Sequence, residues 1–272
     1  MILINGQAAE NVAASDRAVQ FGDGCFTTAR LWQGEVMMLE AHLRRLREAC
    51  HRLLIQHIDW EALRQEMMTV AAATRDEGVI KVILSRGSGG RGYSARGCEQ
   101  PTRIVSLSAY PAHYLQLRQT GAKLALSTIR LGRNPLLAGI KHLNRLEQVL
   151  IRTELEQTGA DEALVLDTEG QLVECCAANL FWRSGKQVFT PVLSDSGVNG
   201  ILRQWVIARL RQQGTSVSEV RMPPGVLNDA DEVLITNALM PILPVSEIEN
   251  RLYSNRELFY QLCEQDDLQG TL

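Results

Sequence analysis

The stretch LLAGIKHLNRLEQ, residues 136–148, places Lys141 between a short apolar run and a segment with the spacing of a helix. An amine nucleophile must be partly deprotonated, and apolar neighbours lower the pKa of a lysine by disfavouring its charged form. A lysine that snorkels from a helix start fits the pattern about equally well. Because a helix N-terminus is unfavourable for a cation, the position favours a functional amine. Only four of the 28 basic residues are lysines: Lys81, Lys123, Lys141 and Lys186.

Composition indicates a globular protein that acts on a small molecule. The 272 residues are 45% hydrophobic and 22% charged, with a net charge of −3. We find no basic stripe interleaved with aromatic residues and no apolar stretch of membrane-spanning length, so neither nucleic acid nor a membrane is expected as a partner. A cytoplasmic location is the default expectation. The six cysteines lack metal-ligand spacing, and we expect reduced core residues and no metal site.

Hydrophobic periodicity predicts a mixed α+β chain in two domains. We expect a smaller N-terminal domain over residues 1–113, a linker over 114–120 and a larger C-terminal domain, carrying Lys141, over 121–272. Helices are predicted over 39–55, 59–78 with Asp59 as the cap, 142–160 and 201–214. Strands are predicted over 1–6, 34–41, 102–114 and 122–131. A strand that enters a glycine loop is predicted over 78–94, a strand meander with turns at DTEG and RSGK over 161–191, and a strand pair or bend over 231–245.

The segment GSGGRG, residues 87–92, matches the glycine spacing of a dinucleotide-binding motif. That motif works because its glycines open a helix whose N-terminus holds a pyrophosphate. Here the glycines lead through YSARGCEQP into another predicted strand. We therefore interpret the segment as a glycine-rich hairpin or a substrate loop.

Two further features could serve a phosphorylated cofactor. Glu174 lies inside an apolar strand, where a carboxylate is costly unless it is paired. A protonated pyridine nitrogen would be one partner and an arginine another; from the residue alone, the arginine is the simpler choice. GVNGILRQWV, residues 197–206, places a turn before a helix, so the amides of Gly200, Ile201 and Leu202 could hold a phosphate.

Seven motifs occur in an order that resembles the fold-type IV pyridoxal-phosphate enzymes, the D-amino-acid aminotransferase-like family, which includes branched-chain aminotransferases and related lyases. They are FGDGCFTTAR (21–30), AHLRRL (41–46), RGSGGRGY (86–93), AGIKHLNRLEQVL (138–150), VECCAANLFW (173–182), GVNGILRQ (197–204) and TNALMP (236–241). The resemblance implies a two-domain α+β fold with pyridoxal 5'-phosphate between the domains, near a homodimer interface. It implies Lys141 as the Schiff-base lysine and general base, and Glu174 as the partner of the pyridine nitrogen. The phosphate would be held by Arg45, the amides of Ile201 and Leu202, and Thr236.

Departures from the aminotransferases favour a lyase. Aminotransferases of this family commonly carry Glu after the Phe of the first motif, whereas Thr27 and Thr28 follow Phe26 here. By resemblance to the lyases, Thr28 is a catalytic hydroxyl; a plain strand threonine is the alternative. The implied reaction eliminates pyruvate from 4-amino-4-deoxychorismate and yields p-aminobenzoate for folate biosynthesis.

The substrate of that reaction has two carboxylates. By resemblance, Lys81, Arg91 and Asn237 would bind them, although an edge-strand lysine and a solvated loop arginine are the ordinary interpretation of the first two. A D-amino-acid or branched-chain aminotransferase of the same fold stays open as an alternative. So does a catalytically silent binding protein, which would not lose a yellow colour on borohydride reduction.

Overall fold

The computed structural model describes residues 1–263, and these form two compact units. Unit 1 comprises Met1–Tyr110 and Ile140–Asn144; unit 2 comprises Pro111–Gly139 and the described residues from Arg145 onward. This division differs from the expected one, because the segment containing Lys141 groups with unit 1. Residues 264–272 of the expected C-terminal domain lie outside the described residues.

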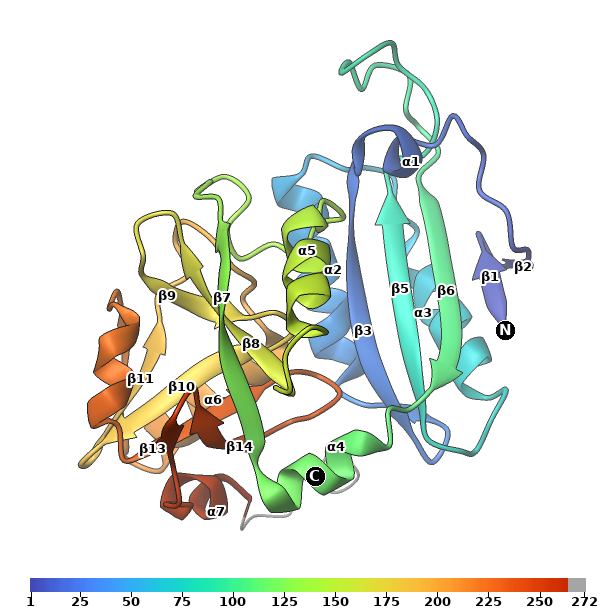
Figure 1. The fold of residues 1–272 in the computed structure, drawn as a ribbon. Helices are drawn as coiled ribbons and strands as arrows, with labels where there is room; N and C mark the ends of the chain where they lie inside the picture. Colours follow the sequence, from blue (N-terminus) through green and yellow to red (C-terminus); the bar gives the residue numbers. More distant parts are fainter. Residues whose placement is uncertain (264–272) are drawn as a thin grey trace. The chain divides into compact units, whose positions relative to one another are not determined.

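Unit 1 is built on an antiparallel six-stranded sheet (Figure 1). The strand order is β2-β1-β6-β5-β3-β4, with β5 in register against both β3 and β6 along its whole length. The strands are β1 (Ile2–Ile4), β2 (Gln7–Ala8), β3 (Gly24–Trp32), β4 (Glu35–Val36), β5 (Gly78–Ser85) and β6 (Thr102–Ala109). The sheet therefore brings β3 and β5, which carry several of the expected site residues, side by side.

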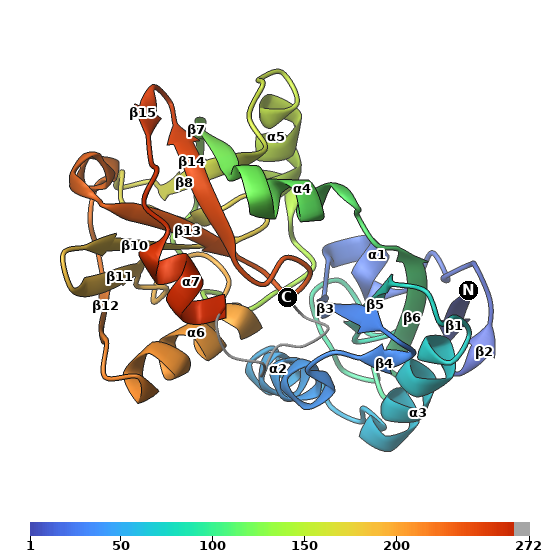
Figure 2. The ribbon, with the colours of Figure 1, turned by 90° about the horizontal axis from the view of Figure 1, so that it is seen from below.

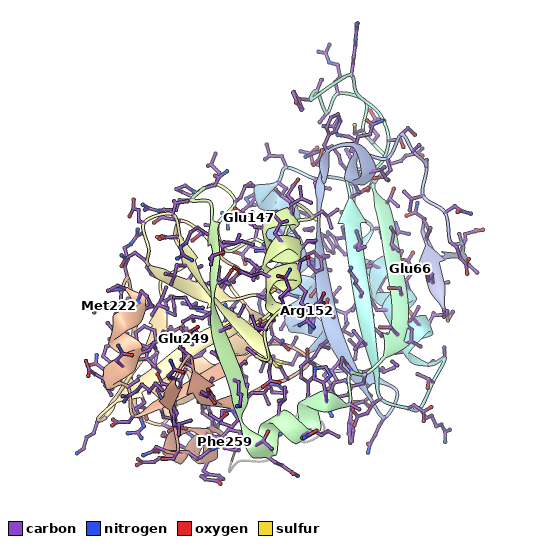
Figure 3. All side chains as sticks on the ribbon, in the orientation of Figure 1. Glu66, Glu147, Arg152, Met222, Glu249 and Phe259 are labelled. Atoms are coloured by element: carbon purple, nitrogen blue, oxygen red, sulfur yellow. The ribbon has the colours of Figure 1, made fainter. Side chains whose placement is uncertain are left out.

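Two helices, α2 (Leu39–Arg52) and α3 (Trp60–Ala71), cover one face of this sheet (Figure 2). The predicted cap of the second helix is confirmed, because the Asp59 carboxylate accepts from the Ala62 amide at 2.9 Å. Glu66 on α3, labelled in Figure 3, pairs with Arg103 on β6 at 2.7 Å. Fully buried leucines and a methionine fill the space between helices and sheet, each stabilising by about 1.5–3 kcal/mol; they include Leu31, Leu43, Leu46, Leu63 and Met67.

The glycine segment 87–92 lies in the connection between β5 and β6, which extends beyond the end of the sheet (Figure 1). Because β5 and β6 are antiparallel neighbours, the hairpin interpretation is confirmed. The buried Arg17 on the short helix α1 (Arg17–Phe21) donates to the carbonyls of Gly92 and Ser94. The loop is thus held from α1 and carries no helix for a dinucleotide.

Unit 2 is built on a nine-stranded mixed sheet with the path β12-β11-β10-β13-β14-β7-β8-β9, β15 pairing with β14. Its end strand β9 is joined to the interior strand β10 by a turn in which the Cys175 amide donates to the Ala178 carbonyl at 2.7 Å, so the sheet curls. The strands are β7 (Ala122–Leu131), β8 (Glu162–Asp167), β9 (Leu172–Cys175), β10 (Asn179–Ser184), β11 (Gln187–Pro191), β12 (Ser216–Val220), β13 (Glu232–Thr236), β14 (Leu243–Ile248) and β15 (Arg251–Leu252).

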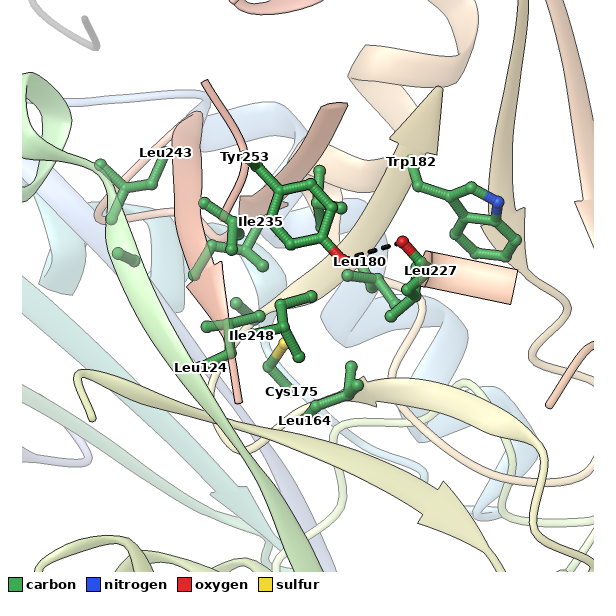
Figure 4. Close-up of a cluster of buried hydrophobic side chains, with 14 of the residues drawn as sticks. Leu124, Leu164, Cys175, Leu180, Trp182, Leu227, Ile235, Leu243, Ile248 and Tyr253 are labelled. Atoms are coloured by element: carbon green, nitrogen blue, oxygen red, sulfur yellow. Dashed lines mark hydrogen bonds between the residues drawn. The ribbon is translucent and has the colours of Figure 1, made fainter. Parts of the chain in front are cut away.

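One of the hydrophobic clusters of unit 2, drawn in Figure 4, packs together side chains from several of these strands, among them Leu124, Leu164, Leu180 and Ile235. Figure 4 marks one hydrogen bond among the residues drawn. The Tyr253 hydroxyl donates to the Leu227 carbonyl at 2.8 Å, which satisfies a buried donor. The helical elements are α4 (His113–Thr120), α5 (Leu146–Leu155), α6 (Ile201–Gln212), the 3-10 helix η1 (Pro224–Asp229) and α7 (Glu257–Cys263). The residues expected as a linker, 114–120, thus lie in α4.

The helix predicted over 142–160 is shorter, because α5 begins at Leu146 and ends at Leu155. Residues before it form backbone pairs with β3: the Phe26 amide donates to the Lys141 carbonyl at 2.9 Å, and the Leu143 amide donates to the Gly24 carbonyl at 3.0 Å. The prediction that Lys141 stands at a helix start was therefore wrong. Pairing to a strand fixes this lysine instead.

Candidate active site

One face of the sheet in unit 1 carries three of the expected site residues. Side chains alternate along a strand, so Phe26 and Thr28 of β3 point to the face opposite the buried Thr27. Lys81 on β5 stands directly opposite Thr28 in the register and is exposed. We call Phe26, Thr28, Lys81 and Lys141 the lysine face.

The two lysines of this face converge on one aromatic ring. The Lys141 Nζ lies 4.7 Å from the centroid of the Phe26 ring, and the Lys81 Nζ lies 5.3 Å from the same centroid. Each ammonium is attracted by the negative face of the ring, which limits where the amine can point. The lysine face therefore offers an amine, a second cation and the Thr28 hydroxyl within one small region.

Arg45, expected to bind phosphate, lies on α2 at the covered side of β3. Its Nη2 donates to the Thr27 Oγ1. Its Nε is buried and has no hydrogen-bond acceptor in the described part of the chain. Burial lowers the pKa of the Arg45 guanidinium to about 10. A half-buried cation whose Nε is buried and unused is an environment in which an anion binds favourably.

Arg91 and Lys81 belong to the same hairpin but lie in different parts of it. Arg91 is exposed in the β5–β6 connection, whereas Lys81 lies in the middle of β5.

In unit 2, Glu174 on β9 is 4% exposed and is held by a backbone donor. The Val198 amide donates to its Oε2 at 2.8 Å. Burial lowers the pKa of Arg145, and the carboxylates of Glu174 and Glu147 oppose that shift. Glu174 is therefore an oriented, buried carboxylate with an arginine in its neighbourhood. Both partners considered for it, an arginine and a protonated ring nitrogen, remain chemically suitable.

The turn before α6 packs closely against the side chain of Asn179. The N-cap Gly200 provides no side-chain acceptor for the amides of the first turn, which include those of Ile201 and Leu202. A Cβ on Gly200 would lie 2.1 Å from the Asn179 Oδ1, so a larger residue does not fit. The Asn179 Nδ2 donates to the Val198 carbonyl at 2.9 Å. The buried side-chain amide of Asn179 thus connects this turn with Val198, whose backbone amide donates to Glu174.

The last two expected residues follow each other at the end of β13. Thr236 is 2% exposed, and its hydroxyl donates to the Pro241 carbonyl. The Asn237 Nδ2 donates to the Ala177 carbonyl at 3.0 Å, while its Oδ1 accepts from the amides of Leu239 and Met240. Both side chains close the turn after β13, a role the sequence analysis missed.

Unit 2 also buries an acid that the sequence analysis did not select. Glu162 on β8 is 8% exposed and accepts from the amides of Ala163 and Ala177, at 2.8 and 3.1 Å. Burial raises its pKa to about 7, against the effect of these donors and of the Arg152 charge. In the sequence, Glu162 is only the second residue of the segment 161–191, which is predicted to form strands.

Comparison with known proteins gives a consistent result. Residues 24–248 match the amino-transferase class IV family. The chain is 40% identical to aminodeoxychorismate lyase of Vibrio harveyi over 256 residues, covering 93% of this chain and 94% of that protein. It is 32% identical to a putative branched-chain-amino-acid aminotransferase of Methanocaldococcus jannaschii over 268 residues, covering 94% and 91%. The crystal structure of 4-amino-4-deoxychorismate lyase from Pseudomonas aeruginosa superposes with a TM-score of 0.94 at 36% identity, over 100% of both chains.

Residues 1–263 were compared with the requirements of a membrane-spanning helix and of a metal site. No helix there is both long and apolar enough to span a membrane. No group of three or more His, Cys, Asp or Glu side chains there has an arrangement that could hold a metal ion.

Proposed function

Because the chain belongs to the amino-transferase class IV family, we propose that it is a pyridoxal-phosphate-dependent lyase that converts 4-amino-4-deoxychorismate to p-aminobenzoate and pyruvate. The similarity to two lyases of this specificity, at 40% and 36% identity, supports the choice of reaction. The structural observation that carries it is the lysine face, where Lys141, Lys81 and Thr28 from three separate segments surround Phe26. The amine can take a proton from the substrate, the cation can bind one of its carboxylates, and the hydroxyl can place a proton.

Enzymes of this family use pyridoxal 5'-phosphate, and the residues of this chain fit that group. The unused buried Nε of Arg45 and the first-turn amides of α6 suit a phosphate. The oriented carboxylate of Glu174 suits a protonated ring nitrogen. We assign Arg45, Ile201, Leu202 and Thr236 to the phosphate. The Thr236 hydroxyl donates to the Pro241 carbonyl and would turn from it to donate to a phosphate oxygen.

When bound, the cofactor supplies an aldehyde for an amine and a ring that stores an electron pair. Lys141 would hold the cofactor through its amine until substrate binds. The released Lys141 then takes the proton from the amine-bearing ring carbon of the substrate. The C–O bond to the enolpyruvyl group breaks, and that group gains a proton and leaves as pyruvate. Thr28, on the same face, places this proton or holds the leaving group.

Lys81 orients the substrate through one of its two carboxylates. The residue is exposed on the lysine face and directly opposite Thr28, so a carboxylate bound there would lie next to the reacting groups. Arg91 and Asn237 remain proposed ligands of the carboxylates. The Asn237 side chain would do so while it also holds the turn after β13.

The second candidate is a branched-chain or D-amino-acid aminotransferase, which the 32% identity to a putative branched-chain-amino-acid aminotransferase favours. Purified protein should be incubated with aminodeoxychorismate alone, and separately with D-alanine or leucine plus a keto acid. We expect p-aminobenzoate in the first case and only slow exchange of amino groups in the second. The opposite pattern would establish the aminotransferase. Colourless protein that borohydride does not label would establish a silent binding protein.

We propose further that the enzyme works as a homodimer, as the resemblance of its motifs to this family implies, and that it lies in the cytoplasm, the default expectation for this sequence. Sedimentation of the purified protein checks the first point. A single species at twice the 30.2 kDa chain mass is expected.

A further inference from the structure

A row of three polar side chains connects β3 with α2: the buried Thr27 and His42 and the half-buried Arg45. Thr27 has no exposed surface and His42 is 1% exposed, and the Thr27 Oγ1 lies 2.6 Å from the His42 Nδ1. The Arg45 Nη2 donates to the same Thr27 oxygen. Thr27 therefore contacts both a histidine and the arginine assigned to the phosphate.

The direction of these hydrogen bonds follows from the charges. Burial, followed by the charge of Arg45, lowers the pKa of His42 well below its usual 6.5, so the ring is neutral near pH 7. An arginine only donates, so the Thr27 oxygen accepts from Arg45 and its proton must go elsewhere. The acceptor in reach is the His42 Nδ1, with the ring proton on Nε2. Each group thus has one defined role in the order Arg45, Thr27, His42.

We propose that Thr27 is a positioning residue for Arg45: its hydroxyl, oriented by His42, fixes the guanidinium so that the unused Nε faces the cofactor phosphate. The inference rests on the proposed function, in which Arg45 binds that phosphate. Long arginine side chains lose rotational freedom when they bind a ligand, and a prior hydrogen bond reduces that loss. Thr27 therefore acts on cofactor affinity without touching the cofactor.

The test uses three variants of the full chain, freed of cofactor. Thr27→Val keeps the branched shape and removes the hydroxyl, Thr27→Ser restores the hydroxyl, and Arg45→Ala removes the arginine. Titrations with pyridoxal phosphate and with pyridoxal, which lacks the phosphate, are followed by absorbance. The readout is the affinity for pyridoxal phosphate divided by the affinity for pyridoxal. General loosening of the fold would weaken the binding of both ligands alike and leave this ratio unchanged.

We expect Thr27→Val to lower this ratio about tenfold, the effect of one hydrogen bond to a charged group. Thr27→Ser should restore the ratio, and Arg45→Ala should lower it at least as far as Thr27→Val does. A normal ratio in Thr27→Val with a reduced one in Arg45→Ala would overturn the positioning role alone. A normal ratio in Arg45→Ala would overturn the proposed role of Arg45 in phosphate binding. If Thr27→Val does not fold, Thr27→Ala decides by the same ratio.

Discussion

The amine of Lys141 lies over the ring of Phe26, with 4.7 Å between its Nζ and the ring centroid. The backbone holds this arrangement, because the Phe26 amide donates to the Lys141 carbonyl at 2.9 Å. Phe26 and Lys141 are thus joined by a backbone hydrogen bond and by the contact of the amine with the ring. Together these contacts direct the Lys141 amine to the lysine face.

Replacing Lys141 by alanine should lower turnover by at least 10²–10⁴-fold, the usual contribution of one acid–base group. The loss should be larger still, because the same amine holds the cofactor. The matched control is Lys186→Ala, at an exposed turn between β10 and β11, which should keep full activity. Measured p-aminobenzoate formation at the wild-type rate in Lys141→Ala would refute the role.

Lys81→Met should raise the KM for aminodeoxychorismate about 10–100-fold and change kcat much less, because a charge-assisted hydrogen bond to a carboxylate is lost. Lys123→Met provides the control, since Lys123 is exposed on β7 and pairs with Glu247 at 3.0 Å. Steady-state kinetics on both variants decide. An unchanged KM in Lys81→Met would remove Lys81 from substrate binding.

Gly200→Ala should destabilise the protein by about 1–3 kcal/mol, because its Cβ would lie 2.1 Å from the Asn179 Oδ1. Asn179 must then shift, and its hold on the Val198 carbonyl weakens. Gly159→Ala is the control, as a Cβ there meets no atom within 4 Å. Urea denaturation of both variants provides the measurement. Equal stability of the two would contradict the account of this turn.

The pKa of Glu162 gives a prediction with a defined sign. A carboxyl whose folded pKa is raised from 4.5 to about 7 is better protonated in the folded state, so folding stability falls as pH rises through this interval, by about 3 kcal/mol. Glu162→Gln cannot ionise and should lack this fall. Its free energy of unfolding relative to wild type should therefore increase between pH 5 and pH 8.

The control for that comparison is Glu156→Gln, at an exposed position that pairs with Arg152 four residues earlier. This variant should follow the wild-type pH dependence. Urea denaturation at both pH values measures the difference. If Glu162→Gln and Glu156→Gln keep the same pH dependence, Glu162 ionises normally in the folded protein.

Local features of the sequence predicted most of the elements. The Asp59 cap, the helix after Gly200 and the glycine hairpin each have a signal within a few residues, and the structure contains all three. The grouping of residues 140–144 with unit 1 has no such signal, since it depends on pairing with β3 far away in the chain. The sequence therefore singled out Lys141 but placed it wrongly at the start of a helix.

The same limit applies to the site residues. Thr28 and Lys81 share a face because β3 and β5 pair in register, and β4, α2 and α3 separate these two strands in the chain, so no local pattern predicts the pairing. The contact of Thr27 with Arg45 could not be predicted, because it requires knowing which face of β3 the helix α2 covers. Likewise, the use of Asn237 to hold its own turn depends on the carbonyl of Ala177, on a different strand connection.

The central claim is that the chain itself carries out the elimination, and the direct measurement is product stoichiometry. Purified protein with pyridoxal phosphate and aminodeoxychorismate, without any keto acid, should release p-aminobenzoate and pyruvate in equal amounts over many turnovers. Fluorescence measures the first product and a coupled lactate dehydrogenase assay the second. Equal amounts that vanish in Lys141→Ala are the predicted result. No p-aminobenzoate from wild-type protein that carries its cofactor would contradict the account.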